Sequence, residues 1–174
     1  MERQALWPEN VARPIAPYTP GIRTGGMVFT AGQVAFDNQG SIIGRGDVAA
    51  QTRKALENVK AVLEAGGAAL KDVVKTTVFM KDIGEFQRMN QVYREFFQGV
   101  DPLPARSTIQ AKLAFEDLLV EVEAVAVLPS ATRAVRARTA GSRSARPARA
   151  GRARTARRQA SGRQGRAARR RTGR

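Results

Sequence analysis

The chain has 174 residues, a length that fits one ordinary domain with its own core. It contains no cysteine and no histidine, which excludes disulfides, thiol nucleophiles, cysteine zinc sites and the commonest general base. Chemistry at neutral pH must therefore use carboxylates, arginine, lysine, tyrosine, backbone groups and water. We expect no metal site and no cofactor.

The net charge of +15 is unevenly distributed along the chain. Residues 130–174 hold 16 of the 30 basic residues, all of them arginine, and no acid. The first 129 residues hold the other 14 basic residues against all 15 acids, so this part is close to neutral at −1. Hydrophobic patterning stops at the same point. The sequence therefore predicts a folded domain at 1–129 and a disordered arginine-rich tail at 130–174.

No segment resembles a membrane or export signal. No apolar run approaches the length that spans a bilayer, and residues 1–10 lack the charged and apolar regions of a signal peptide. We therefore expect a cytoplasmic protein with no membrane partner.

The first predicted elements are a hairpin and a helix. The hairpin covers 22–36, because apolar runs at 27–29 and 34–36 are separated by glycines. A helix is predicted over 47–65, where apolar residues recur at helical spacing behind Asp47, a residue suited to the N-cap.

A strand, a second helix and two more strands follow. The β-branched run at 73–80 predicts a strand, and Asp82 with Glu85 resembles the capping box that starts a helix. Strands are predicted at 105–111 and 119–128. One face of the second helix is apolar and must lie on a sheet; its residues are Phe86, Met89, Tyr93, Phe96 and Phe97.

The order β-β-α-β-α-β-β predicts an α+β sandwich with both helices on one face of the sheet. The other face then needs a cover. Subunit association is the simplest way to supply it, because a bare apolar sheet face favours aggregation.

The last strand carries two carboxylates. Period-two alternation places Glu121 and Glu123 on the same side as Val125 and Val127. Such residues belong either to a solvated sheet face or to a polar pocket between subunits, and the pattern alone favours the solvated face.

Three further residues are candidates for binding, each with a structural alternative. Arg106 follows a rigid proline approach to a strand, and its planar guanidinium suits a carboxylate; most such arginines are surface or structural residues. Tyr18 lies in a proline-stiffened segment and otherwise packs over a hydrophobic edge. Asn90 interrupts an apolar helix face and needs a partner; a helix-to-loop hydrogen bond is the favoured interpretation.

Seven groups of residues stand in a coherent order between about 14 and 128. They are Pro17-Tyr18-Thr19-Pro20, Phe29-Thr30-Ala31-Gly32-Gln33, Ala50-Gln51-Thr52 with Leu56-Glu57-Asn58, Val74-Lys75-Thr76-Thr77-Val78-Phe79, Asn90-Gln91-Val92-Tyr93, Pro104-Ala105-Arg106-Ser107-Thr108 and Val120-Glu121-Val122-Glu123-Ala124. In these motifs the chain resembles the RidA family, also called YjgF-like.

The resemblance implies a chorismate-mutase-like fold with a mixed sheet, a homotrimer with three clefts between subunits, and hydrolysis of 2-aminoacrylate-type enamines and imines to 2-keto acids and ammonia. It implies two catalytic residues. Arg106 grips the substrate carboxylate, and Glu121 polarises the attacking water. The substrate-binding residues would be Tyr18, Gly32, Asn90 and the backbone at Thr108. Glu121 has to be ionised or nearly so, which a nearby arginine favours and burial opposes.

Two departures from the family pattern concern substrate preference. Ala31 stands where the family usually has a serine, so a hydroxyl contact to the substrate would be missing. The stretch 111–117 differs from the usual Ala-Arg-Leu-Pro sequence. Arg106 and Glu121 remain in place.

The sequence allows two other functions beside the deaminase. One is an RNA-directed protein, either an endoribonuclease or a translation inhibitor that uses the basic tail. The near-neutral body without histidine argues against RNA cleavage, and the tail has no aromatic residue for base stacking. The other is a small-molecule-binding trimer without turnover.

The tail allows three hypotheses. It is a nucleic-acid-binding arm, a membrane-surface or partner tail, or a sequence read past its natural end in another coding frame. The abrupt change to arginine alone favours the last. Any nucleic-acid binding is expected to be non-specific and confined to the tail.

Overall fold

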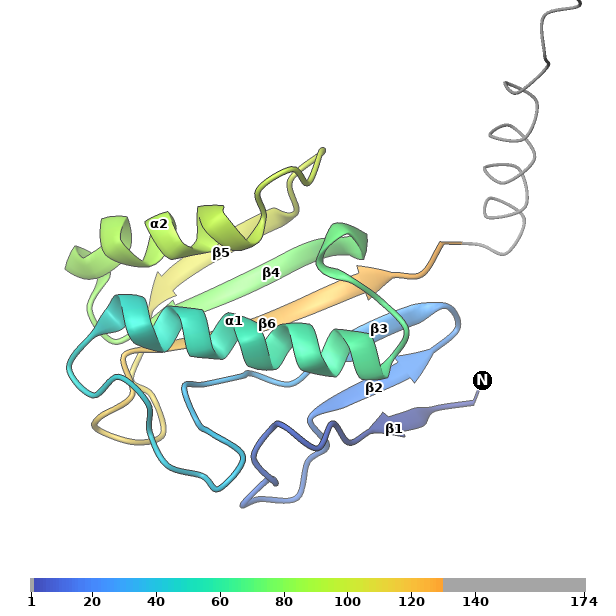
Figure 1. Cartoon of the computed structure of the whole chain (residues 1–174), viewed down its shortest axis with the longest axis horizontal. Coiled ribbons are helices and arrows are strands. Elements are labelled where there is room, and N and C mark those ends of the chain that lie inside the picture. Colours follow the sequence, from blue (N-terminus) through green and yellow to red (C-terminus); the bar gives the residue numbers. More distant parts are fainter. Residues whose placement is uncertain (1, 130–174) are drawn as a thin grey trace, which may run out of the picture.

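The structure, a computed structural model, describes residues 2–129, which form a six-stranded sheet carrying two α-helices (Figure 1). The strands are β1 (Gln4–Leu6), β2 (Gly21–Thr24), β3 (Met27–Thr30), β4 (Val73–Met80), β5 (Ala105–Gln110) and β6 (Val120–Val127), and the helices are α1 (Val48–Ala65) and α2 (Phe86–Phe96). Short 3₁₀ turns cover Leu70–Asp72 and Ile83–Glu85. The strand order is β1-β2-β3-β6-β4-β5, and the β4–β5 pair is parallel while its neighbours are antiparallel, so the sheet is mixed.

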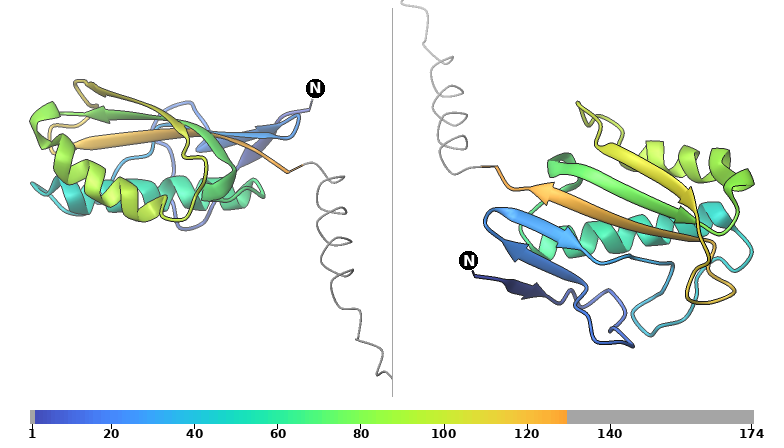
Figure 2. Two further views of the ribbon diagram at one scale, coloured as in Figure 1. Left: turned by 90° about the horizontal axis from the view of Figure 1, so that it is seen from above. Right: turned by 180° about the vertical axis from the view of Figure 1, so that it is seen from behind.

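Both helices lie on one face of the sheet, as predicted (Figure 2). Along β6 alternate residues are buried beneath them: Val120, Val122, Ala124 and Ala126. The residues between these point to the opposite face, which no element of residues 2–129 covers. Large apolar side chains are exposed there, among them Phe29, Ile109 and Val127.

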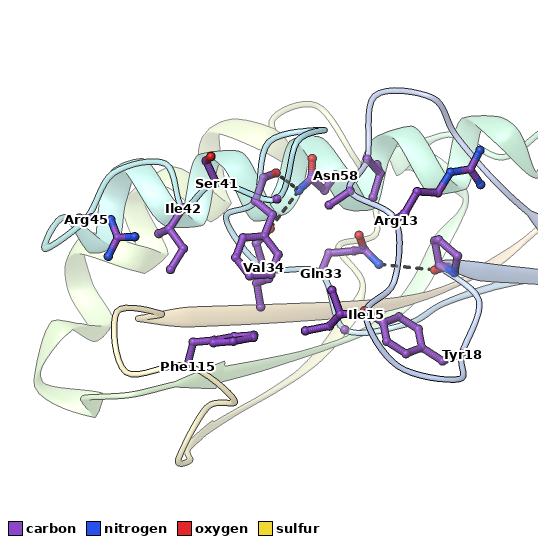
Figure 3. Close-up of a pocket in the computed structure, with 16 residues that line it drawn as sticks. Arg13, Ile15, Tyr18, Gln33, Val34, Ser41, Ile42, Arg45, Asn58 and Phe115 are labelled. Atoms are coloured by element: carbon purple, nitrogen blue, oxygen red, sulfur yellow. Dashed lines mark hydrogen bonds between the residues drawn. The ribbon is translucent and has the colours of Figure 1, made fainter.

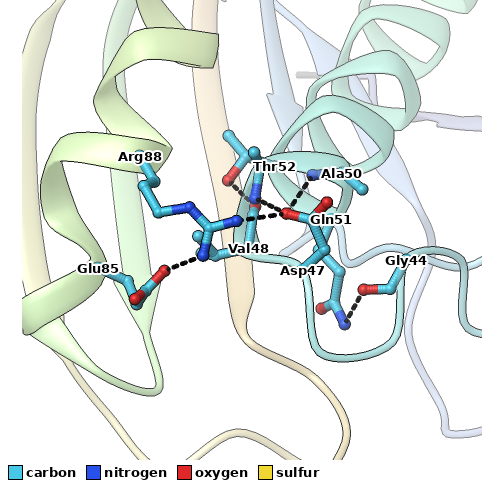
Figure 4. Close-up of polar contacts among 9 residues, drawn as sticks. Gly44, Asp47, Val48, Ala50, Gln51, Thr52, Glu85 and Arg88 are labelled. Carbon is cyan, nitrogen blue, oxygen red and sulfur yellow. Dashed lines mark hydrogen bonds and ion pairs between the residues drawn. The ribbon is translucent and has the colours of Figure 1, made fainter.

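Helix α1 begins behind Asp47 as the sequence indicates, whereas Asp82 caps the 3₁₀ turn that precedes α2 and α2 itself begins at Phe86. The Asp47 carboxylate accepts hydrogen bonds from the first-turn amides of α1, and Asp82 accepts one from the amide of Gly84. The predicted capping box is incomplete, because Glu85 pairs with Arg88 at 2.7 Å rather than reaching back to Asp82. Arg88 also bonds Asp47 at 3.0 Å, so this arginine ties the start of α1 to α2 (Figure 4).

The first hairpin is shorter than predicted. It pairs β2 with β3 around Gly25 and Gly26, whose φ angles of 55° and 81° fit the two-residue turn that requires positive φ at both positions. The run 34–36 is not a strand arm; it lies in a loop that crosses the end of β6. The side chain of Asn58 in α1 donates to two backbone carbonyls of this loop, and Ala35 is buried within it.

Strand β1 was not predicted from the sequence, because three residues are too few to show alternation. The tail predicted at 130–174 lies outside the described residues. Within 2–129, neither helix is both long and apolar enough to cross a membrane.

Candidate functional site

Glu121 lies on the uncovered face of the sheet. It stands near the start of β6, opposite Phe79 of β4, and its side chain is half-buried. A cavity of about 400 Å³ opens beside it, and Tyr18, Gly32 and Phe115 contribute to the wall. No hydrogen bond or ion pair joins the Glu121 carboxylate to another residue of the described chain. The carboxylate is therefore available to a ligand or a water molecule.

Gly32 makes room for this carboxylate. A Cβ atom on Gly32 would lie 1.7 Å from Glu121 Oε1 and 2.6 Å from its Cδ. Since Gly32 is absent from the residues with positive φ, its backbone is open to any amino acid, and the close approach alone requires glycine. The predicted role of Gly32 in close approach is thus explained by its contact with Glu121.

Two amides that sequence reasoning did not single out fix the loop that contains Gly32. The backbone of Gln33 exchanges hydrogen bonds with Val122 at 2.8 and 2.9 Å, and its side chain donates to the carbonyl of Ala31 at 3.2 Å. Asn58 of α1 donates to the carbonyls of Val34 and Phe36, both at 2.9 Å (Figure 3). Gln33 and Asn58 both belong to the sequence motifs, but the burial that points to their structural role is visible only in the fold.

The ionisation of Glu121 is less favourable in the folded chain than in water. Burial raises the pKa of Glu121 above its ordinary value, and the negative charge of Glu123 on the same face raises it further. The expectation that a nearby arginine favours the ionised form is not met within one chain. Arg106 lies on the other side of the sheet. A group with a raised pKa is suited to accept a proton and return it.

Arg106 faces α2. It stands opposite Thr76 across the β4–β5 pair, and its guanidinium carbon lies 4.4 Å from the ring centre of Tyr93 and 5.5 Å from that of Phe86. The Tyr93 hydroxyl shares a 2.8 Å hydrogen bond with Thr76 Oγ1, which fixes the ring. These contacts attract the guanidinium to the two rings through cation–π interaction.

The Arg106 guanidinium has no acidic partner. Within residues 2–129 no ion pair or side-chain hydrogen bond involves it. It lines a cavity of about 790 Å³ formed with the end of α2 and the segment 99–104. An unpaired, planar cation at a cavity is a ready partner for a ligand carboxylate.

Asn90 and Thr108 belong to the Arg106 side. Asn90 follows Phe86 by four residues and precedes Tyr93 by three, so it shares their helix face. The hydrogen bond expected for its side chain is not found among residues 2–129. Thr108 stands two residues after Arg106 on the same face of β5, and its buried Oγ1 has no hydrogen-bond partner.

The six residues predicted from the sequence thus form two groups of three. Tyr18, Gly32 and Glu121 meet at the cavity on the uncovered face, and Arg106, Asn90 and Thr108 gather beside α2. The structure does not bring the two groups together within one chain. Among residues 2–129, no three acidic side chains gather in an arrangement that could hold a metal ion.

A second hollow of about 760 Å³ adjoins the Glu121 cavity and shares part of its wall, including Tyr18 and Phe115 (Figure 3). Arg13 and Arg45 lie at its two ends. Arg45 is paired with Asp117, and Arg13 lies over the ring of Trp7. The hollow shares its apolar wall with the Glu121 cavity and extends it.

Comparisons with known proteins agree on the family. The model of the family described as Endoribonuclease L-PSP matches residues 9–128. A RutC family protein of Pyrococcus horikoshii is 42% identical over 124 residues, which are 71% of this chain and 97% of that protein. A 2-iminobutanoate/2-iminopropanoate deaminase of Salmonella typhimurium is 42% identical over 120 residues, 68% of this chain and 93% of that one.

Solved structures show the same architecture. The YjgF gene product of Escherichia coli has a TM-score of 0.66 at 40% identity, covering 71% of this chain and 98% of that one. Escherichia coli TdcF with bound serine has a TM-score of 0.67 at 37% identity, covering 72% and 99%. The family model, the relatives and the solved structures agree, and the chain therefore belongs to the RidA (YjgF-like) family, whose model carries the description Endoribonuclease L-PSP.

Proposed function

We propose that this protein hydrolyses reactive 2-imino acids and their enamine tautomers, of the 2-aminoacrylate type, to 2-keto acids and ammonia. One observation carries the proposal: an unpaired arginine and an unpaired glutamate with a raised pKa, each at its own cavity, lie on opposite sides of one sheet. The charge and planar shape of the Arg106 guanidinium suit a substrate carboxylate. The raised pKa of Glu121 suits a group that takes up a proton and releases it during the reaction.

The two groups can act on one small substrate only if they come from two chains. We propose a homotrimer of the chorismate-mutase-like type, in which the Arg106 side of one subunit faces the Glu121 side of the next and each interface forms a cleft. The exposed apolar residues of the uncovered sheet face support such an assembly. Deaminase relatives that share about two fifths of their residues with this chain support the reaction.

The chemistry demands little of the protein. An enamine first takes a proton at C3 and becomes the imine, whose C2 is electrophilic. Glu121 accepts a proton from water as the oxygen bonds to C2 and passes it to the nitrogen, which gives a carbinolamine. Glu121 then moves the hydroxyl proton of the carbinolamine to the nitrogen, so that ammonia leaves as the C2=O bond forms and the C2–N bond breaks. Arg106 holds the carboxylate throughout and orients C2 toward the water. Tyr18, Asn90 and Thr108 would line the cleft.

Mixing two inactive variants tests this arrangement. An amino-acid oxidase supplies the imine, and keto-acid release is followed with Arg106→Ala subunits, Glu121→Gln subunits, and trimers refolded from an equal mixture. Each single variant should be nearly inactive. Random mixing should restore about a quarter of the wild-type activity, because one interface in four combines an intact Arg106 with an intact Glu121. No recovery from trimers shown to be mixed would overturn the shared cleft.

The RNA-directed alternative remains testable through the tail. We propose that nucleic acid binds only through the arginines of 130–174, without sequence preference, because the first 129 residues are near neutral. A chain ending at Pro129 should lose salt-sensitive binding to single-stranded RNA yet keep its assembly and its imine hydrolysis. Salt-insensitive RNA binding by the shortened chain would instead favour a ribonuclease.

A further inference from the structure

The wall of the Glu121 cavity is apolar and aromatic. Ile15, Tyr18, Phe36, Phe115 and Leu118 surround the carboxylate, and Ile15, Tyr18 and Phe115 keep much of their surface exposed to solvent. The ring of Phe115 meets that of Phe36 edge to face at 5.8 Å between centres.

The segment that carries Phe115 is the one whose sequence departs from the family pattern, and it is firmly held. Gln51 of α1 donates to the carbonyl of Asp117 and accepts from the amide of Leu119, both at 2.8 Å. Arg45 pairs with the Asp117 carboxylate. On the other side of Asp117, Lys81 Nζ donates to the carbonyl of Glu116 at 2.6 Å, so Phe115 stands on a braced loop rather than a free one.

We propose that Phe115, with Phe36 and Ile15, forms a subsite for the side chain of the substrate. The chain then prefers imines of 2-amino acids with large apolar side chains, of the leucine, methionine or phenylalanine type, over 2-iminopropanoate. The inference rests on the proposed deaminase function and adds the substrate class to it. A substrate whose C2 lies beside Glu121 has its side chain within reach of this wall, because both line one cavity.

The size of the expected substrate preference follows from the number of carbon atoms in the substrate side chain. Each methylene group placed in a hydrophobic pocket changes specificity by roughly tenfold or more. A leucine-derived imine has three more carbons than an alanine-derived one. We therefore expect kcat/KM for the leucine-derived imine to exceed that for the alanine-derived imine at least tenfold, and most of the difference to depend on Phe115.

The test measures this ratio in the full chain. An amino-acid oxidase generates each imine, and kcat/KM is compared for wild type, Phe115→Ala and Phe115→Leu. The alanine variant should lower the ratio about tenfold, while the leucine variant should keep most of it. Ile83→Ala is the matched control, since Ile83 is an exposed apolar residue that lines neither cavity beside Glu121. Calorimetry with pyruvate and 4-methyl-2-oxopentanoate should show the same preference without turnover.

The outcomes separate this inference from the function beneath it. Hydrolysis of the alanine-derived imine with no preference for the larger one, or an equal loss on both substrates in Phe115→Ala, overturns the subsite and leaves the deaminase intact. A ratio that falls as much in Ile83→Ala also overturns it. A chain that hydrolyses neither imine overturns the proposed function and this inference with it.

Discussion

The Arg106 side and the Glu121 side of the sheet prepare their groups by opposite means. Arg106 is held in place: its guanidinium lies over two aromatic rings of α2, and a hydrogen bond to Thr76 fixes one of these rings. Glu121 is given space: Gly32 leaves a gap for its carboxylate, and no described residue bonds to it. The difference fits the proposed function, in which the arginine holds the substrate carboxylate in one orientation and the glutamate changes its protonation state.

The two groups need different surroundings in the proposed reaction, because Arg106 has to stay charged whereas Glu121 has to gain and lose a proton. The arginine keeps its charge anywhere in a protein, so the face of an aromatic ring costs it little. The glutamate is destabilised as an anion by burial and by Glu123, which raises its pKa. Four substitutions test this comparison. One replaces Arg106, one replaces Glu121, and two alter the surroundings of Glu121.

A large effect is expected on the Arg106 side. Arg106→Lys keeps the charge but loses the planar pair of donors and the broad stacking surface. Transition-state stabilisation should fall by about 2 to 4 kcal/mol, through weaker binding and misorientation of the carboxylate. Steady-state kinetics on the oxidase-generated imine measure it. A variant with unchanged kcat/KM would show that charge alone is enough.

Glu121→Gln should fail differently. The shape is kept and the base is lost, so keto-acid release should fall about 100-fold or more while a keto acid still binds. The fold should not suffer: the raised pKa of Glu121 means that its protonation favours the folded state at low pH, and this contribution is lost as pH rises through the raised pKa. At pH 7 the variant should unfold at the same or a higher denaturant concentration. A less stable variant would point to a structural role.

Gly32→Ala tests whether space alone prepares Glu121. The added methyl group would overlap Glu121 Oε1, so the carboxylate must move. A displacement of about 1 Å costs roughly 10- to 100-fold in rate. Binding of pyruvate, held from the Arg106 side, should change little in calorimetry. Wild-type rates in this variant would mean that the position of Glu121 is not critical.

The smallest effect is expected from Glu123→Gln, which also serves as the control for Glu121. Glu123 lies two residues along the same face and lines neither cavity beside Glu121. Removing its charge should lower the pKa of Glu121, so the acid limb of the rate–pH profile should move to lower pH with little change in the maximal rate. Equal losses of rate from Glu121→Gln and Glu123→Gln would refute the distinct role of Glu121.

The sequence by itself predicted the elements whose pattern is long and regular. Helix α1 with its Asp47 cap, strand β4 and the alternation of β6 follow from local spacing, because each repeats over many residues. The placement of both helices on one face followed from the order of the elements. The residues of the candidate site came from the motifs, since a side chain's chemistry is visible in the sequence.

Only the tertiary structure decided how those residues are grouped. A period of two says that Arg106 and Thr108 share a face and that Glu121 and Glu123 share one; it does not say which of these faces the helices cover. That depends on the parallel pairing of β4 with β5 and on α2 packing over Arg106, contacts between segments far apart in the chain. For the same reason the clamps by Gln33 and Asn58, and the aromatic wall at Phe115, became evident only once the loops lay side by side.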